Sequence, residues 1–424
     1  MIRTSIRIKF LIYLSILLLT LSTTSLTGQR TGLDLLDHKS RVDIPFEIHN
    51  GLILIKLKMN GINLNFLYDT GAENTILFKR EIAVVLGMKS SRRVKLIGSS
   101  LNNFIYGYIV HNVYFQFQSN VSRYENIIVL EENIFDLQQV LGLHVDGLIG
   151  GSFFRNTGVK IDYKKQIITI YHPAKNKMNL DDYSEIPVQF HDHKPYIQAY
   201  IEKYDGTSQN IRLLIDTGSS IPLILHANVD SSLIAPDHLT KGHIGVGISG
   251  ALIGTVGIVK KIGFSEFSFD EVITSLQDFE YITPEEASKT RHGIIGNDML
   301  NRFTVYIDYS RNQIFLKPGK KYNKSFSYDK SGLIISAVGL DFNQYFIQAV
   351  VPASPAEKAG LLAGDEILSV NSVSTSFLSL NQIQRTLKRK EGTTIRIKIS
   401  RKGKKQTFFV VLEDMLTKTK SKTE

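Results

Sequence analysis

The sequence predicts a mainly β protein made of two duplicated units and a separate C-terminal domain. Three observations support this fold class: a long internal repeat in nearly constant register, alternation of apolar and polar residues around turn signals, and a new set of motifs beyond Pro318-Gly319. The 424 residues are enough for two or three domains, each with its own core. A hydrophobic content of 43% and a charged content of 21% are typical of a globular protein.

The repeat is centred on two short acidic motifs. Asp69-Thr70-Gly71-Ala72 returns 147 residues later as Asp216-Thr217-Gly218-Ser219. Two further segments return at an offset of 146: DGLIGGSFF (146–154) as HGIIGNDML (292–300), and IDYKKQIITI (161–170) as IDYSRNQIFL (307–316). Such constant spacing indicates a duplicated structural unit.

Each acidic motif follows a predicted β-hairpin. IKLKM and INLNF alternate on either side of Asn60-Gly61, which is a type I′ turn signal, and YIQAYIEKY and NIRLLI flank Asp205-Gly206. Both aspartates are therefore expected at the ends of strands. The glycine-rich segments 95–108 and 243–257 are expected to form two more hairpins, with mobile tips that cover a substrate.

Asp-Thr-Gly after an apolar strand, followed by two apolar residues and a glycine, resembles one lobe of an aspartic protease. Two such lobes in one chain resemble the pepsin-like and bacterial retropepsin-like enzymes, over roughly residues 45–318. The resemblance implies a two-lobed acid-protease β-barrel fold, with lobes at 45–172 and 186–318. It also implies that Asp69 and Asp216 are the catalytic pair.

The chemistry accounts for a pair of carboxylates. Peptide hydrolysis without a metal or a nucleophile needs a base that activates water and an acid that protonates the leaving amine. Two carboxylates held close together cannot both ionise easily, so one proton is shared and both roles coexist. Asp69 and Asp216 are expected to fill these roles.

The resemblance implies supporting roles for the residues beside the two aspartates. The threonines would join the two loops by hydrogen bonds, and the glycines would permit a tight turn and a close approach. A serine after one glycine can bond its aspartate, whereas the matching alanine cannot, so the pair need not be symmetric. Tyr68, before Asp69, needs a partner for its hydroxyl if it is buried. The supporting positions are Thr70, Gly71, Thr217, Gly218 and Ser219.

The residues beyond Pro318-Gly319 resemble a bacterial PDZ domain at 330–414, after a linker at 319–329 and before a basic tail at 415–424. The motifs are SGLIISAVG (331–339), SPAEKAGLLAGDEILSVN (354–371) and the helical SLNQIQRTLKRK (379–390). A PDZ domain adds a peptide strand to a sheet edge and captures a C-terminal carboxylate on backbone N–H groups. The resemblance assigns the peptide-binding loop to Ser331, Gly332, Leu333 and Ile334. The alternative is a domain that packs on the rest of the chain and binds no peptide.

The N-terminus has the pattern of a signal peptide at residues 1–28. Arg3, Arg7 and Lys9 precede the apolar run 10–21, which is shorter than the roughly 20 residues that span a bilayer. The alternative is an uncleaved anchor, which would be the only membrane contact. The pattern predicts export to the periplasm or cell envelope of a Gram-negative-type bacterium.

The composition argues against several other classes of site and partner. The chain has no cysteine, so disulfides and a thiol nucleophile are excluded. Removal of residues 1–28 would reduce the net charge from +10 to +7, and the basic residues are spread out, which does not indicate nucleic-acid binding. His191 and His193 lack further ligands, so no metal and no cofactor are expected.

These features together predict an exported, monomeric aspartic endopeptidase. Its partners would be protein or peptide substrates, with C-terminal peptides bound by the PDZ domain. A rival interpretation is a non-catalytic envelope protein that uses the lobes and the PDZ domain as a peptide clamp or scaffold. A homodimer of whole chains is disfavoured, because each chain already carries two acidic motifs.

Overall fold

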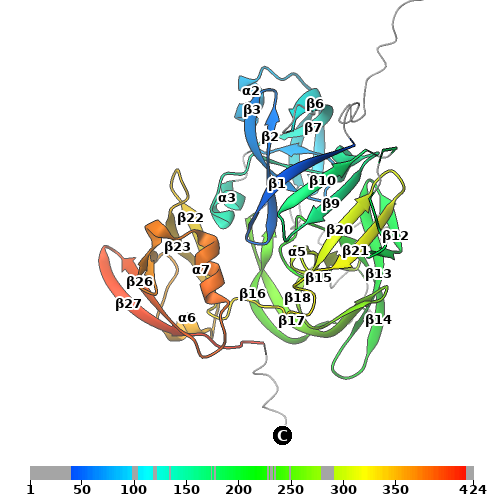
Figure 1. Cartoon of the computed structure of the whole chain (residues 1–424). Helices are drawn as coiled ribbons and strands as arrows, with labels where there is room; N and C mark the ends of the chain where they lie inside the picture. The colour runs from blue at the N-terminus through cyan, green and yellow to red at the C-terminus, as the bar shows by residue number, and fades with distance from the viewer. Residues whose placement is uncertain are drawn as a thin grey trace, which may run out of the picture.

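The computed structural model describes residues 40–416, except 98–103, 118–121, 133–134, 173, 176–177, 227–228, 230–232, 234, 248–249 and 278–290. The described chain is mainly β and contains three sheets (Figure 1). The predicted signal peptide and most of the basic tail lie outside these residues. No helix in the described ranges is long and apolar enough to cross a membrane.

The first repeat supplies ten strands to the largest sheet. They are β1 (Arg41–His49), β2 (Leu52–Met59), β3 (Ile62–Tyr68), β4 (Ile76–Leu77), β5 (Ser90–Ile97), β6 (Phe104–Gln116), β7 (Ser122–Leu130), β8 (Gly147–Ile149), β9 (Gly158–Asp162) and β10 (Ile167–Tyr171). Three short helices accompany them: α2 (Arg80–Val85), α3 (Phe135–Leu141) and the 3₁₀ helix η2 (Gly151–Phe154).

The second repeat forms an eight-stranded sheet and adds three strands to the first. The eight are β12 (Val188–His191), β13 (Lys194–Glu202), β14 (Ser208–Ile215), β15 (Leu223–His226), β16 (Asp237–Gly247), β17 (Gly250–Phe264), β18 (Phe267–Gln277) and β19 (Gly293–Ile295). The other three are β11 (Ser184–Ile186), β20 (Phe303–Asp308) and β21 (Gln313–Pro318). A helix, α5 (Asn297–Leu300), precedes β20.

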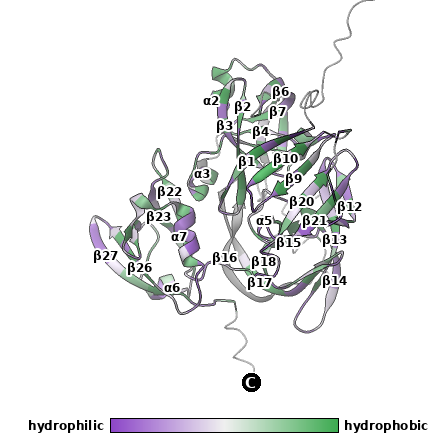
Figure 2. Cartoon of the chain, in the orientation of Figure 1, coloured by the Kyte–Doolittle hydropathy of each residue, from purple (hydrophilic) through white to green (hydrophobic). Residues whose placement is uncertain are grey.

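The two repeats meet in a shared sheet. Its strands run in the order β11, β21, β20, β9, β10, β1, and the repeated strands β9 and β20 pair with each other. The register sets Thr304 against Asp162 and Asp308 against Gly158, so equivalent positions pair reciprocally. One continuous core then includes residues from both repeats. Figure 2 shows hydrophobic residues along β1, β9 and β10, where the repeats join.

The hairpins expected before the two aspartates are confirmed. β2 pairs with β3 around Asn60 and Gly61, whose positive φ angles of 46° and 87° fit a type I′ turn. β13 pairs with β14 on either side of Asp205-Gly206. The two glycine-rich segments also form hairpins, β5–β6 and β16–β17, with their tips outside the described residues.

The C-terminal domain has its own sheet and its own core. The strands are β22 (Leu333–Val338), β23 (Gln344–Val350), β24 (Glu366–Val370), β25 (Val373–Ser374), β26 (Thr394–Arg401) and β27 (Lys404–Val411), with helices α6 (Pro355–Lys358), η3 (Thr375–Phe377) and α7 (Leu380–Leu387). Helix α7 begins at a capping box, in which Ser379 accepts from the backbone N–H of Gln382. The predicted strand and helix of the peptide groove correspond to β22 and α7.

The polar linker 319–329 is packed along the second repeat. The guanidinium of Arg302 donates to the carbonyls of Lys321, Tyr322 and Lys324, and it lies 3.6 Å from the ring centroid of Phe326. Charge-assisted hydrogen bonds of this kind fix a segment more firmly than its composition suggests. The linker is therefore an ordered connection between the two parts of the chain.

Candidate active site

The two acidic motifs occupy equivalent places in the two sheets. Asp69 follows β3, whose last residue pairs in parallel with Ile149 of β8. Asp216 follows β14, whose last residue pairs in parallel with Ile295 of β19. The backbone N–H of each aspartate donates to the carbonyl of that partner, at 3.0 Å for Asp69 and 2.9 Å for Asp216. The backbone therefore leaves the sheet at equivalent positions after β3 and after β14.

Reciprocal threonine contacts join the two loops. The hydroxyl of Thr70 donates to the carbonyl of Ile215 at 2.8 Å and accepts from the N–H of Thr217 at 3.0 Å. The hydroxyl of Thr217 donates to the carbonyl of Tyr68 at 2.8 Å and accepts from the N–H of Thr70 at 3.0 Å. Both threonines are buried. These four bonds hold the aspartates of one chain against each other.

Each aspartate lies over the glycine of the opposite loop. A Cβ atom on Gly71 would lie 2.5–2.7 Å from the carboxylate atoms of Asp216, and a Cβ atom on Gly218 would overlap the carboxylate of Asp69 in the same way. Only glycine permits this approach. Both aspartates remain partly exposed within buried stretches, so water and substrate can reach them.

Backbone donors orient the two carboxylates. One carboxylate oxygen of Asp69 accepts from the N–H groups of Gly71 at 2.8 Å and Ala72 at 3.0 Å. The carboxylate of Asp216 accepts from the N–H of Gly218 at 2.7 Å. Ser219 is buried beside this loop, where its own N–H donates to the carbonyl of Asp216 at 3.3 Å. The loops themselves therefore fix the carboxylate orientations.

The two aspartates differ in their tendency to hold a proton. Burial, followed by the charge and hydrogen bond of Asp216, raises the pKa of Asp69 well above its usual range. Burial also raises the pKa of Asp216, but the hydrogen bond from Asp69 and the charge of Arg291 oppose that effect. The pair therefore retains a proton more readily than isolated carboxylates do, and Asp69 has the stronger tendency to hold it.

The threonine contacts give a prediction about stability. Thr70→Val should lower the free energy of unfolding by about 2–5 kcal/mol, because it leaves the buried carbonyl of Ile215 and the N–H of Thr217 without partners, at about 1–3 kcal/mol for each group. Urea denaturation measures the change. Thr70→Ser keeps the hydroxyl and is the matched control. Equal stability of the valine and serine variants would contradict the assigned role of these bonds.

Sequence reasoning missed a second set of contacts between the repeats. The hydroxyl of Tyr163 donates to Asn297 Oδ1 at 2.5 Å, and Asn297 Nδ2 donates to the carbonyl of Gly51 at 2.5 Å. The backbone N–H of Asn297 also donates to the carbonyl of Ser219 at 2.7 Å. Asn297 thereby positions the loop that follows Asp216. A signal was present, because Asn297 stands directly after the repeated glycine and Tyr163 closes the repeated IDY.

Tyr68 lies behind Asp69 and is fully buried. Its hydroxyl makes no hydrogen bond of good geometry with any described residue. Burial, and then the nearby Tyr309, Tyr163 and Asp69, raise the pKa of Tyr68 well above its usual value. The phenol therefore stays neutral, and its buried ring contributes to the low-dielectric surroundings on the inner side of Asp69.

The histidine and acidic residues outside the pair make local contacts. Among the described residues, no group of three or more His, Asp or Glu side chains is arranged to hold a metal ion. His191 forms an exposed ion pair with Asp192, at 3.2 Å. Asp146 and Asp162, the acidic residues of the repeated segments, bond local groups: Asp146 accepts from Lys79 and the N–H of Asn65, and Asp162 accepts from two adjacent backbone N–H groups.

The predicted peptide-binding loop lies at the start of β22. Ser331 and Gly332 donate their backbone N–H groups to one carboxylate oxygen of Asp329, at 2.8 and 2.9 Å, and the N–H of Leu333 donates to the hydroxyl of Ser331 at 3.1 Å. Gly332 has a φ of +79°, and a Cβ atom there would overlap Ser354. Glycine is thus required by the loop itself.

Comparison with known families decides what the C-terminal domain is. Residues 346–401 match the PDZ domain family. The chain ends in a PDZ domain. The edge strand β22 and helix α7 lie against each other, and they are the two elements between which a PDZ peptide groove is expected.

Two further similarities were found. The carboxy-terminal processing protease CtpB of Bacillus subtilis (strain 168) is 31% identical over 134 residues, which cover 31% of this chain and 26% of that protein. The match thus spans about a quarter of that relative's length. The crystal structure of basic 7S globulin from soybean is similar over 66% of this chain and 95% of its own, with 9% identity and a TM-score of 0.39.

Proposed function

We propose that this chain is an aspartic endopeptidase that hydrolyses peptide bonds with Asp69 and Asp216. The observation that carries the proposal is the reciprocal placement of two carboxylates, each over the glycine of the opposite loop. Two structural arguments support it: the reciprocal threonine bonds between the loops and the paired strands β9 and β20. These features support a two-lobed arrangement like that of an acid protease.

The carboxylates divide the chemistry between them. Asp216, as the ionised partner, takes a proton from a water molecule while that water attacks the carbonyl carbon of the scissile bond. Asp69 donates its proton to the carbonyl oxygen, which gives a neutral tetrahedral diol. The proton on Asp216 then passes to the amide nitrogen, and Asp69 recovers a proton from the diol as the C–N bond breaks. The pair ends with one proton, as it began.

The PDZ domain and the N-terminal pattern complete the proposal. A PDZ groove binds extended peptides, so the substrates are proteins or peptides with accessible ends. The basic and apolar N-terminal pattern supports export to a bacterial periplasm or envelope. Both acidic motifs come from one chain, so a monomer holds a complete pair.

The proposal predicts a bell-shaped dependence of kcat/KM on pH. Below both apparent pKa values the pair has no base, and above both it has no acid. Because the pKa of Asp69 is raised, the alkaline limb should lie above the usual value of about 3.9 for an aspartate. The pKa of Asp69 is also higher in the folded protein than in the unfolded chain. The protonated pair therefore stabilises the fold at low pH, and this contribution is lost as the pH rises through the folded-state pKa.

Hydrolysis of unfolded casein by the purified protein lacking residues 1–28 tests the proposal. We expect a bell-shaped profile, inhibition by pepstatin and no loss of activity with EDTA. A rate that keeps rising through alkaline pH, or activity abolished by EDTA, would contradict the two-carboxylate mechanism. Complete absence of hydrolysis at every pH would favour the non-catalytic clamp.

A further inference from the structure

The peptide groove of the PDZ domain faces the rest of the chain. β22 is the edge strand of its sheet, paired with β23 on one side only. Helix α3 of the first repeat lies against β22 (Figure 1) and also contacts β17. A peptide that binds in the groove must add to this same edge of β22. The edge is therefore covered by a segment of the chain itself.

The covering segment is Phe135–Leu141 with the turn that follows it to His144, called the α3 segment below. At Gly142, which ends the helix with a φ of +67°, a Cβ atom would lie 3.0 Å from the Cβ of Leu380 and 3.4 Å from the Cβ of Ala337. Leu380 begins α7 and Ala337 belongs to β22. The backbone at Gly142 thus rests between the two walls of the groove.

Polar contacts fix the rim of this interface. Nε2 of His144 lies 2.9 Å from the carbonyl of Leu340, and its ring packs edge-on against Phe342 with centroids 4.9 Å apart. Nδ2 of Asn381, on α7, donates to the carbonyl of Ile48 at 3.4 Å. The His144 contact is exposed and the Asn381 bond is long, so each contributes little net free energy and can be exchanged for other contacts.

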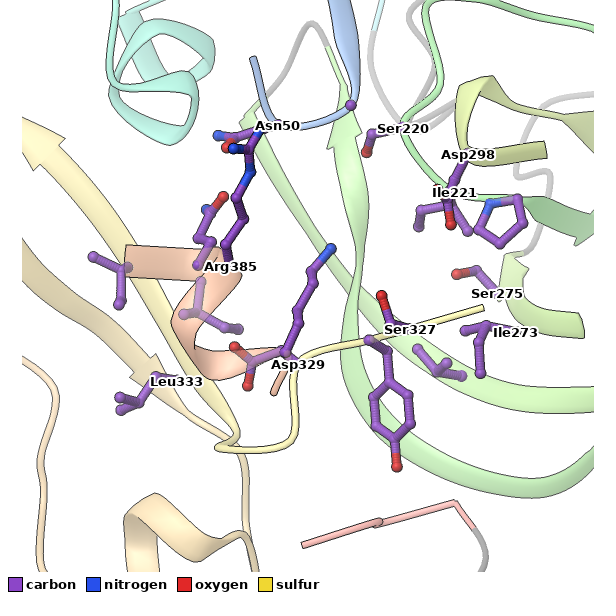
Figure 3. Close-up of a pocket in the computed structure, with 18 of the residues that line it drawn as sticks. Asn50, Ser220, Ile221, Ile273, Ser275, Asp298, Ser327, Asp329, Leu333 and Arg385 are labelled. Carbon is purple, nitrogen blue, oxygen red and sulfur yellow. The ribbon is translucent and has the colours of Figure 1, made fainter. Parts of the chain in front are cut away.

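The predicted carboxylate-binding loop already has an internal partner. The Asp329 carboxylate holds the N–H groups of Ser331 and Gly332, which lie in the loop that the PDZ resemblance assigns to a peptide carboxylate. Next to this loop, the space between β22 and α7 is a cavity of about 310 Å³, lined by Leu333 and Ile335 of β22, by Gln384 of α7 and, across from them, by Ser220 and Ile221 of the second repeat. Figure 3 shows Leu333, Asp329 and Arg385 on one side, and Ile221, Ile273 and Asp298 across from them.

The attachment of the PDZ domain differs on its two sides. Towards the second repeat, Leu416 is fully buried against Val256, Ile258 and Ile273. The hydroxyl of Tyr328 accepts from the N–H of Leu416 and donates to Asp414. Towards the first repeat, the α3 segment closes over the groove. The buried side chain and hydrogen bonds at Leu416 therefore attach the PDZ domain to the second repeat independently of the α3 segment.

We propose that the α3 segment is an internal occupant of the end of the PDZ groove at Ala337 and Leu380, and that a peptide longer than the remaining cavity binds along β22 only after displacing it. The proposal rests on the PDZ domain and on the groove contacts, and it holds whether or not the pair of aspartates is catalytic. Because α3 also contacts β17, its displacement would reach that strand, whose Val256 lines the same cavity as Ser220 of the Asp216 loop. Groove occupancy and the active site are coupled through one helix.

A reversible cross-link tests the proposal. The chain has no cysteine, so Gly142→Cys combined with Ala337→Cys creates the only possible intramolecular disulfide. The two Cβ atoms would lie about as close as a disulfide requires, roughly 3.5–4.5 Å. Both cysteines are introduced into the Asp69→Asn variant, so that peptide binding is measured without cleavage. The probe is a pool of decapeptides with free carboxyl termini that represent all twenty terminal residues.

We expect the oxidised protein to bind the peptide pool at least about tenfold more weakly than the same protein after reduction. We also expect His144→Ala, in the same Asp69→Asn background, to bind the pool more tightly than Asp69→Asn alone. The single cysteine variants, treated identically, are the controls. Three results would overturn the proposal: no cross-link on oxidation, equal binding by the oxidised and reduced forms, or no binding by any form. Failure of the catalytic proposal would instead appear as unchanged casein hydrolysis in Asp69→Asn.

Discussion

Asp69→Asn and Asp216→Asn should each reduce peptide hydrolysis by about 10²–10⁴-fold or more while the protein remains folded. Either change removes the shared proton, and with it the base or the acid that the reaction needs. An asparagine keeps the oxygen that accepts the backbone N–H groups of the loop, so the geometry around the other carboxylate is retained. Casein hydrolysis and circular dichroism, measured on the same preparations, report the two effects separately.

Asp192→Asn is the matched control for these variants. Asp192 is an exposed aspartate with a φ of +50°, a conformation that asparagine adopts readily, and its carboxylate pairs only with His191 in the described structure. We expect its activity to stay within about twofold of the parent. Residual activity near the parent level in either Asp69→Asn or Asp216→Asn would contradict the assignment of the pair.

Gly71→Ala is expected to abolish most of the activity without touching either aspartate. The new methyl group would overlap the carboxylate of Asp216, which must move away from Asp69. Displacement of a catalytic group by about 1 Å can cost on the order of 10²-fold in rate. We therefore expect a loss of at least that size in kcat, measured on casein.

Gly206→Ala separates this effect from a general loss of stability. Gly206 has a φ of +86° and nothing within 4 Å of a Cβ atom, so alanine there strains the backbone far from the aspartates. It should lower stability by about 1 kcal/mol and leave kcat unchanged. Equal activity in Gly71→Ala and Gly206→Ala would show that the close approach of the loops is unimportant for the reaction.

The pairing of the aspartates was predictable because it depends on repeated local patterns. Two hairpins, two glycines and two repeated strands in constant register define equivalent loops, and equivalent loops meet in a pseudo-symmetric unit. The bounds of helix α7 were predictable for a similar reason, since Ser379 and Gln382 form a local capping box. Hairpin turns and capping boxes can be recognised in the sequence because each is defined by a few neighbouring residues.

Contacts between distant segments were not predictable in this way. Tyr163 reaches Asn297 across 134 positions, and His144 reaches Leu340 across 196. The repeated motifs mark the positions of Tyr163 and Asn297, but no local pattern in the sequence shows that two such distant side chains meet. The loop at Ser331 and Gly332 illustrates the same limit, because its motif predicts N–H groups that face a peptide, whereas Asp329 holds them in the structure. Which side chain completes a site depends on the tertiary structure, and a local sequence motif does not identify it.

The cleavage of a denatured proteome is the most direct test of the central claim, that Asp69 and Asp216 hydrolyse peptide bonds as a pair. Mass spectrometry would count new N-termini after digestion by the parent protein, by Asp69→Asn combined with Asp216→Asn, and by the parent with pepstatin. The account predicts new internal N-termini with the parent alone. The same set of new N-termini produced by the double variant would contradict it.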